Sequence, residues 1–399
     1  TSTADLTLSI TSLEATAERG YVLTLVDSRP ATATDALIVE GERLLEPGAG
    51  TDRMADARQA LSLGETAGHV HLQARALLLV ARLHADAGRT PEAERALVDA
   101  RDRCRAAALA PCEAQSELRL GRLLGSTGRP DRMRERTEVA RAISARSGDL
   151  AGQAEALVEL AGLDINQVRP DAARDRLQQA LTLARAADDR RSEGDVLNLL
   201  GLLASNVGQP DEADAHYQTA LAVRRSIGDE VGAAQTTSNL GALATSLGES
   251  RRAIAYLNEA LAARQKLGNL QAIANTWHNL GVAHANLGEL ETAIGHFERA
   301  LEGWRKSGGR RGEAFALQEM GQSYARLGDR RRALEHLEQG RPIWKEVGDR
   351  RGETQTLLFT AAIAADLEDF RRAADTYRTA LDLARAGALK REVGLALLG

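Results

Sequence analysis

The sequence has few aromatic residues, no excess of basic charge and no long apolar run, and each of these shortages excludes a class of function. Phe, Trp and Tyr make up only 3% of the 399 residues, so we expect neither an aromatic-lined cofactor pocket nor a stacking platform for single-stranded nucleic acid. The 51 Lys and Arg residues are outnumbered by 56 Asp and Glu, which argues against a nucleic-acid partner. Because no run of about 18 apolar residues is present, the sequence predicts no membrane span.

The two cysteines, Cys104 and Cys112, are too few for the disulfide framework of a small secreted protein. They flank a predicted turn between two helices, where they could lie close together, but we interpret them as buried free thiols. A reducing, cytoplasmic location is therefore expected. No basic stretch followed by an apolar one opens the chain, so no secretory signal is expected. The first residue is Thr1 rather than Met, as in a processed chain or a piece of a longer protein.

Motifs that carry catalysis or metal binding are also missing. The sequence contains no Gly-x-x-x-x-Gly-Lys-Ser/Thr loop, no His-Glu-x-x-His, no Gly-x-Ser-x-Gly elbow and no calcium loop. His278 and His284 share a predicted helix, but they lack the i, i+4 spacing of two zinc ligands. We therefore expect no catalytic residue, no metal and no cofactor, and predict that the protein is not an enzyme.

What the sequence does contain is a period of 40 residues that runs without insertion or deletion over about 340 residues. Small residues occupy fixed slots in this period. One slot holds Gly121, Gly201, Gly241, Gly281 and Gly321. A second slot, seven residues later, holds Gly88, Gly128, Gly208, Gly248, Gly288 and Gly328, with Val168 and Glu368 as exceptions. Such a period is typical of a repeat protein in which each unit packs on its neighbours.

Each period predicts two helices. Residues 231–246 carry apolar side chains at helical spacing and stop at Gly248, where the left-handed conformation that ends a helix is least costly for glycine. Residues 250–267 form the partner helix. Pro170 and Pro210 mark the starts of second helices, where the missing N–H has no partner to lose. The repeat is therefore a pair of helices joined by short turns.

The unit 270–309 resembles a tetratricopeptide repeat in its large and small residues. The matching residues are Trp277, Leu280, Gly281, Ala293, Phe297 and Ala300. The period of 40 rather than 34 residues is similar to that of the long-repeat subclass that includes LGN and rapsyn, and to the arrays of bacterial signalling regulators. The resemblance implies an all-α, right-handed superhelix, that is, an α-solenoid of about nine helical hairpins, with the first helix of each pair lining the concave surface.

The predicted organisation is one array preceded by a short segment. Residues 1–29 are expected to be irregular, with a capping helix around Leu13 to Val26, and residues 30–399 to form the array. The predicted units are 30–67, 70–107, 110–147, 150–187, 190–227, 230–267, 270–307, 310–347 and 350–387, followed by a half unit, 390–399. The half unit suggests either a further domain beyond Gly399 or self-association through an open C-terminal end.

Candidate binding residues are those that the repeat does not need for packing. On the slots that the resemblance places on the concave face, the middle units concentrate amide side chains, which donate and accept hydrogen bonds and so suit the backbone of an extended peptide. The predicted peptide-binding residues are Asn198, Asn206, Gln235, Ser238, Asn239, Asn275, His278, Asn279, Asn286, Phe315, Gln318, Glu319, Gln322 and Arg326. Of these, His278 is expected to be pH-sensitive and Arg326 to meet a carboxylate. The alternative is that these residues are only a solvated polar surface.

Two functions fit this sequence. The first is a non-catalytic scaffold that holds an extended or helical segment of a partner protein in the concave groove. The second is the ligand-sensing regulatory arm of a larger bacterial signalling protein, such as a nucleotide-switch transcription activator or a diguanylate cyclase.

Overall fold

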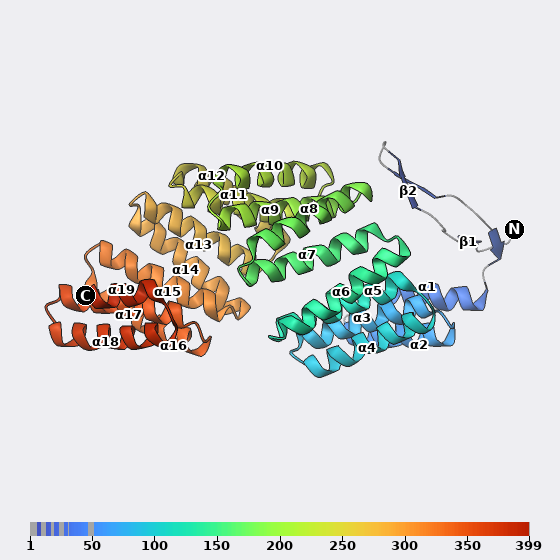
Figure 1. Ribbon diagram of the computed structural model, residues 1–399, viewed down its shortest axis with the longest axis horizontal. Coiled ribbons are helices and arrows are strands. Elements are labelled where there is room, and N and C mark those ends of the chain that lie inside the picture. Colours follow the sequence, from blue (N-terminus) through green and yellow to red (C-terminus); the bar gives the residue numbers. More distant parts are fainter. Residues whose placement is uncertain are drawn as a thin grey trace. The chain divides into compact units, whose positions relative to one another are not determined.

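The computed structural model describes residues 6–8, 13–16, 20–23 and 28–30 as backbone, and residues 32–46 and 52–398 in full (Figure 1). It divides into two compact units, Thr1–Ser192 and Glu193–Gly399, which we call unit 1 and unit 2 and describe separately. In the described residues, nineteen helices follow one another as packed pairs. The first helices of the pairs carry odd numbers and the second helices carry even numbers.

Unit 1 contains eight complete helices and the start of a ninth. They are α1 (Ala33–Leu45), α2 (Arg53–Thr66), α3 (Val70–Asp86), α4 (Thr90–Ala106), α5 (Ala110–Ser126), α6 (Pro130–Ser147), α7 (Leu150–Asn166) and α8 (Pro170–Ala186), and α9 (Arg190–Asn206) begins here.

Unit 2 contains the rest of α9 and ten further helices. These are α10 (Pro210–Ser226), α11 (Glu230–Ser246), α12 (Ser250–Leu267), α13 (Leu270–Asn286), α14 (Leu290–Ser307), α15 (Arg310–Arg326), α16 (Arg330–Glu346), α17 (Arg350–Asp366), α18 (Phe370–Ala386) and α19 (Lys390–Leu398). The predicted all-α solenoid of about nine helix pairs is confirmed.

Local sequence explains where the helices begin and end. The prolines predicted to start second helices do so at α8 and α10. Gly228 adopts a positive φ of 68° between α10 and α11, and the next residue, Asp229, accepts a hydrogen bond from the backbone N–H of Gly232. The glycine thus ends one helix and the aspartate caps the next.

The glycines inside the first helices allow the two helices of a pair to approach closely. A Cβ atom on Gly241 of α11 would lie 2.7 Å from Cγ of Leu257 in α12, which is itself fully buried. The equivalent Gly201 would meet the ring of Tyr217 at 2.6 Å. A larger residue at this slot would push the pair apart, so its recurrence reflects packing.

The helix pairs bring their first helices closer together than their second helices. In unit 2, α11 contacts α13, α13 contacts α15 and α15 contacts α17, whereas the described second helices make no comparable contact with one another. The same holds in unit 1 for α1, α3, α5 and α7. The side formed by the first helices, which we call the first-helix face, is therefore the inner side of each unit.

The N-terminal segment differs from the expected capping helix. Its described residues form four short strands, β1 (Leu6–Leu8), β2 (Leu13–Thr16), β3 (Gly20–Leu23) and β4 (Ser28–Pro30). They pair antiparallel, β1 with β4 and β2 with β3. The alternation Leu-Thr-Leu and the run Tyr-Val-Leu favour strands by their period of two and by their β-propensity. The other residues of the segment lie outside the described part.

Candidate functional site

The predicted peptide-binding residues all lie on four first helices of unit 2, α9, α11, α13 and α15. Six are exposed: Asn206, Gln235, Asn275, Asn286, Phe315 and Arg326. Five are half-buried: Asn239, His278, Asn279, Glu319 and Gln322. Three are buried: Asn198, Ser238 and Gln318. The first-helix face of unit 2 therefore offers a mixed row of exposed and half-buried polar groups.

The buried amides are used inside the protein. The Oδ1 atom of Asn198 accepts hydrogen bonds from Nδ2 of Asn239, at 3.0 Å, and from Oγ1 of Thr236, at 3.2 Å. The Oε1 atom of Gln318 accepts one from Oγ1 of Thr356 at 3.0 Å. These bonds join neighbouring helix pairs, so Asn198 and Gln318 are not free to hold a ligand as expected.

Other amides keep their hydrogen-bonding groups available. Within the described residues, neither Gln235 of α11 nor Asn279 of α13 makes a side-chain hydrogen bond, ion pair or ring contact. By contrast, the exposed Asn275 accepts a hydrogen bond from the indole N–H of Trp304 at 2.9 Å, and Arg326 donates to the carbonyl of Ala285. The free amides are the strongest candidates for contact with a partner.

His278 lies among aromatic rings rather than among charges. Its ring centroid is 5.6 Å from that of Phe297, 5.5 Å from that of Trp304 and 6.2 Å from that of Phe315. Burial lowers the pKa of His278 to about 4, because the apolar surroundings disfavour the charged ring. His278 is therefore neutral at physiological pH.

A second feature, which the sequence analysis missed, recurs at the junction between one helix pair and the next. A residue in the last turn of the second helix pairs with the residue eight positions later, in the first turn of the following first helix. We call the residues at these positions the junction pairs, and in chain order they are Gly64 and Leu72, Cys104 and Cys112, Ser144 and Gly152, Ala184 and Ser192, Arg224 and Gly232, Arg264 and Ala272, Trp304 and Gly312, Trp344 and Gly352, and Ala384 and Glu392.

In unit 2 each junction pair combines a large residue with a small one. A Cβ atom on Gly352 would lie 2.5 Å from Cδ2 of the fully buried Trp344, and one on Gly232 would lie 2.8 Å from Cδ of Arg224. Glycine is therefore required at these two positions to make room for the side chain that fills the junction.

Two of the side chains that fill these junctions are arginines, Arg224 and Arg264, and Arg224 is the more buried of the two. Its side chain is only 2% exposed. The Nη1 atom donates to the carbonyl of Gly232 and to Oγ1 of Thr236, both at 2.6 Å, and Nη2 donates to Asp195. Asp229 lies 3.8 Å from Nε. The guanidinium is thus held by two carboxylates, a hydroxyl and a backbone carbonyl, which balance its buried charge.

In unit 1 the first junction pair is Gly64 and Leu72, and the next three pairs contain only small residues. Cys104 and Cys112 form a disulfide, with their Cα atoms 5.7 Å apart, so the interpretation as free thiols is wrong. The helix-to-helix turn brings the two residues together, because positions i and i+8 face each other at every junction. At the next junction, Ser144 faces Gly152, and neither residue has a side chain long enough to fill the space.

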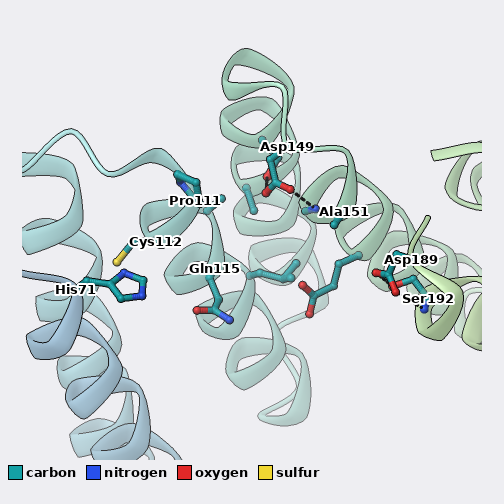
Figure 2. A pocket seen from close by; sticks show the side chains of 14 residues that line it. His71, Pro111, Cys112, Gln115, Asp149, Ala151, Asp189 and Ser192 are labelled. Carbon is teal, nitrogen blue, oxygen red and sulfur yellow. Dashed lines mark hydrogen bonds between the residues drawn. The ribbon is translucent and has the colours of Figure 1, made fainter. Parts of the chain in front are cut away.

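A cavity of about 300 Å³ lies at this junction in unit 1 (Figure 2). Its lining comes from α3, α5, α6 and α7, from the N-cap of α7 and from the start of α9. The lining side chains that carry polar or ionisable groups are His71, Cys112, Gln115, Ser144, Asp149, Glu155, Asp189 and Ser192. No arginine or lysine lines the cavity, so three carboxylates make it acidic.

The carboxylates of this cavity differ in how they are engaged. Asp149 accepts a hydrogen bond from the N–H of Gly152 at 2.9 Å, and its other oxygen lies 3.3 Å from the hydroxyl of Ser144. Glu155 forms an ion pair at 2.7 Å with Arg122, which does not line the cavity. Asp149 therefore remains without a cationic partner at the wall of the cavity.

The described residues show neither a metal site nor a membrane-spanning helix. Across residues 32–46 and 52–398, no three His, Cys, Asp or Glu side chains are grouped so that they could hold a metal ion. None of the described helices is both long enough and apolar enough to cross a bilayer.

Comparison with known proteins agrees with the helix-pair architecture. The family model for the tetratricopeptide repeat matches residues 192–266 and 272–346. No curated protein matches the sequence.

Three solved structures share the fold at low sequence identity. The apo form of the quorum sensor NprR from B. thuringiensis is 17% identical, with a TM-score of 0.59, over 87% of this chain and 97% of that one. Aspartyl phosphate phosphatase F from Bacillus subtilis is 13% identical, with a TM-score of 0.56, over 88% and 94%. A signal transduction ATPase with a tetratricopeptide repeat sensor from Pyrococcus horikoshii is 12% identical, with a TM-score of 0.55, over 92% and 62%.

Residues 192–266 and 272–346 therefore match the tetratricopeptide repeat, and the helix pairs of the chain share the fold of these three structures.

Proposed function

We propose that this protein is a non-catalytic scaffold that binds an extended or helical segment of a partner protein along the first-helix face of unit 2. The observation that carries the proposal is the row of amide side chains on α11, α13 and α15, of which Gln235 and Asn279 have no hydrogen-bond partner among the described residues. Unused amide donors and acceptors on an inner face suit a peptide backbone, which offers both groups at every residue.

The test uses the full chain and a random peptide library displayed on phage. The affinity of a selected peptide is measured by calorimetry for the wild type and for the variant Gln235→Arg, Asn279→Arg and Gln322→Arg. We expect this variant to bind at least about ten-fold more weakly, because bulky cations replace neutral amides at the contact. Its far-UV circular dichroism should be unchanged, because Gln235 is exposed and the other two side chains are only half-buried.

A matched control places the same charges on second helices. Asn258→Arg, Gln265→Arg and Gln339→Arg alter exposed residues of α12 and α16. This control should bind the peptide like the wild type. Equal affinities for the two triple variants would contradict the proposed binding face.

The second candidate function is a sensing arm of a larger signalling protein. Two structures with the same fold are named as a quorum sensor and as an ATPase with a repeat sensor, which favours this candidate. Reading the gene beyond the codon for Gly399 tests it, and a stop codon there would contradict an attached effector domain.

The location of the protein also stays a prediction. A cytoplasmic site was expected from the low cysteine count, whereas the bond between Cys104 and Cys112 favours an oxidising compartment. Trapping free thiols in fresh cell extracts, followed by mass spectrometry, distinguishes the two.

A further inference from the structure

The acidic cavity of unit 1 has a counterpart in unit 2 that is already filled. A shift of 80 residues, which is two periods, relates Ser144 to Arg224. The same shift relates Asp149 to Asp229 and Gly152 to Gly232. The cavity is therefore the place that an arginine side chain occupies two repeats later.

The groups that hold the guanidinium of Arg224 are largely retained around the cavity. Asp149 caps α7 in the same way as Asp229 caps α11, with a hydrogen bond to the N–H three residues later. Gln115, at the position equivalent to Asp195, presents an amide oxygen that accepts a hydrogen bond. Figure 2 places Asp149 and Gln115 on different helices around the same space. The hydroxyl equivalent to that of Thr236 is missing, because Ala156 stands there, and the carboxylate of Asp195 is replaced by the amide of Gln115.

Charge and size favour the same occupant. No arginine or lysine lines the cavity, and the carboxylate of Asp149 at its wall has no cationic partner, so the cavity favours a cation. Its volume of about 300 Å³ exceeds what the side chain of Ser144 fills. A planar guanidinium that meets a carboxylate and carbonyl oxygens at fixed angles is recognised better than a spherical ammonium group.

We propose that this cavity binds the guanidinium group of an arginine side chain from the partner peptide. In the cavity of unit 1 this guanidinium would lie as the guanidinium of Arg224 lies at its own junction in unit 2. This assignment rests on the proposed peptide-binding function and adds a residue preference to it. Asp149 would pair with the guanidinium, while Gln115 and the carbonyl of Gly152 would accept its remaining N–H groups.

The first experiment measures the cavity without any peptide. Binding of N-acetyl-arginine amide and of N-acetyl-citrulline amide, its neutral analogue, is followed by NMR titration of the full chain. We expect the arginine compound to bind at least about ten-fold more tightly, since the hydrogen bonds to a charged group are the stronger ones. Equal affinities for the two compounds would overturn the proposal.

Three variants locate the binding. Ser144→Arg places the chain's own guanidinium in the cavity and should abolish binding of the arginine compound. Ser147→Arg, on the exposed surface of the same helix, is the matched control and should bind like the wild type. Gln115→Asp restores the carboxylate found at Asp195 and should tighten binding by about ten-fold. If Ser144→Arg fails to fold, Gln115→Asp still tests the proposal. An affinity of Gln115→Asp for N-acetyl-arginine amide equal to that of the wild type would overturn it.

A second arm identifies the source of the guanidinium. Peptides selected from the library are compared with copies in which each arginine is replaced by citrulline. The arginine peptide should bind the full chain more tightly than both its citrulline copy and N-acetyl-arginine amide. If the free amide binds as tightly as the peptide, the assignment to a peptide is wrong and the cavity serves a small guanidinium compound. If the unit 2 triple variant loses the peptide while Ser144→Arg retains it, the proposed function holds and the cavity assignment fails.

Discussion

Replacing Val168 by glycine should stabilise unit 1, although glycine usually weakens a fold. Val168 ends α7 with a φ of 57°, in the left-handed region, where Gly128 and Gly208 stand at the equivalent positions. The left-handed conformation costs a residue with a Cβ atom about 1–2 kcal/mol. Glycine loses about 0.5–1 kcal/mol through its greater freedom in the unfolded chain. Because Val168 is 85% exposed, little buried apolar area is lost, and a net gain of about 0.5–1 kcal/mol remains.

Native-state hydrogen exchange is the suitable assay, because it reports the opening of individual helices in a long array. Amides of α7 and α8 should exchange about two- to five-fold more slowly in Val168→Gly than in the wild type. Val168→Ala should show a smaller gain, since it removes only the β-branching.

The control is Val139→Gly in the middle of α6, where the backbone is helical and the side chain is partly exposed. That change should speed exchange, because glycine costs about 0.5 kcal/mol more than valine inside a helix. If Val168→Gly speeds exchange as Val139→Gly does, the reasoning from the left-handed backbone is refuted.

Three further outcomes are expected. Gly352→Ala should lower the free energy of unfolding by about 1–3 kcal/mol, because its methyl group would overlap the buried Trp344; a melting temperature equal to that of the wild type would contradict this packing. Burial lowers the pKa of His278 to about 4, so the folded state binds fewer protons than the unfolded state. The contribution of neutral His278 to the free energy of unfolding is therefore complete above about pH 6.5 and is lost as the pH falls toward 4. The melting temperature of His278→Gln should therefore fall less than that of the wild type over this range, and parallel pH profiles would disprove it. Reduction of the bond between Cys104 and Cys112 should destabilise unit 1 by about 2.5 kcal/mol, as expected for a loop of about nine residues, and unchanged denaturant midpoints after verified alkylation would count against this.

The fold could be predicted from the sequence because equivalent positions, 40 residues apart, require residues of the same size or backbone conformation. Gly241 must be small since Leu257 lies against it, and Gly248 must adopt a positive φ of 77° to end α11. Each requirement applies to the same position of every repeat, so glycine or another small residue recurs at that position along the sequence. The segment before the array has no such series, and there the short alternation of Leu6 to Leu8 was the signal for a strand.

The candidate site was less predictable because exposure depends on partners in the next helix pair. Asn239 and Asn279 occupy equivalent positions 40 residues apart, yet of the two only Asn239 forms a hydrogen bond with an adjoining helix pair, to Asn198. The cavity was missed because it arises from the absence of a large side chain at Ser144, which is visible only beside Arg224. A comparison of positions eight residues apart across each turn would have revealed it.

The close approach of the first helices has a consequence for the kind of peptide that would fit the proposed binding face. Packed helices lie about 8–10 Å apart, and an extended chain advances about 3.3 Å per residue. A ligand strand that crosses α11, α13 and α15 therefore meets an equivalent position at about every third residue. Sequence preferences in such a ligand should recur in triplets.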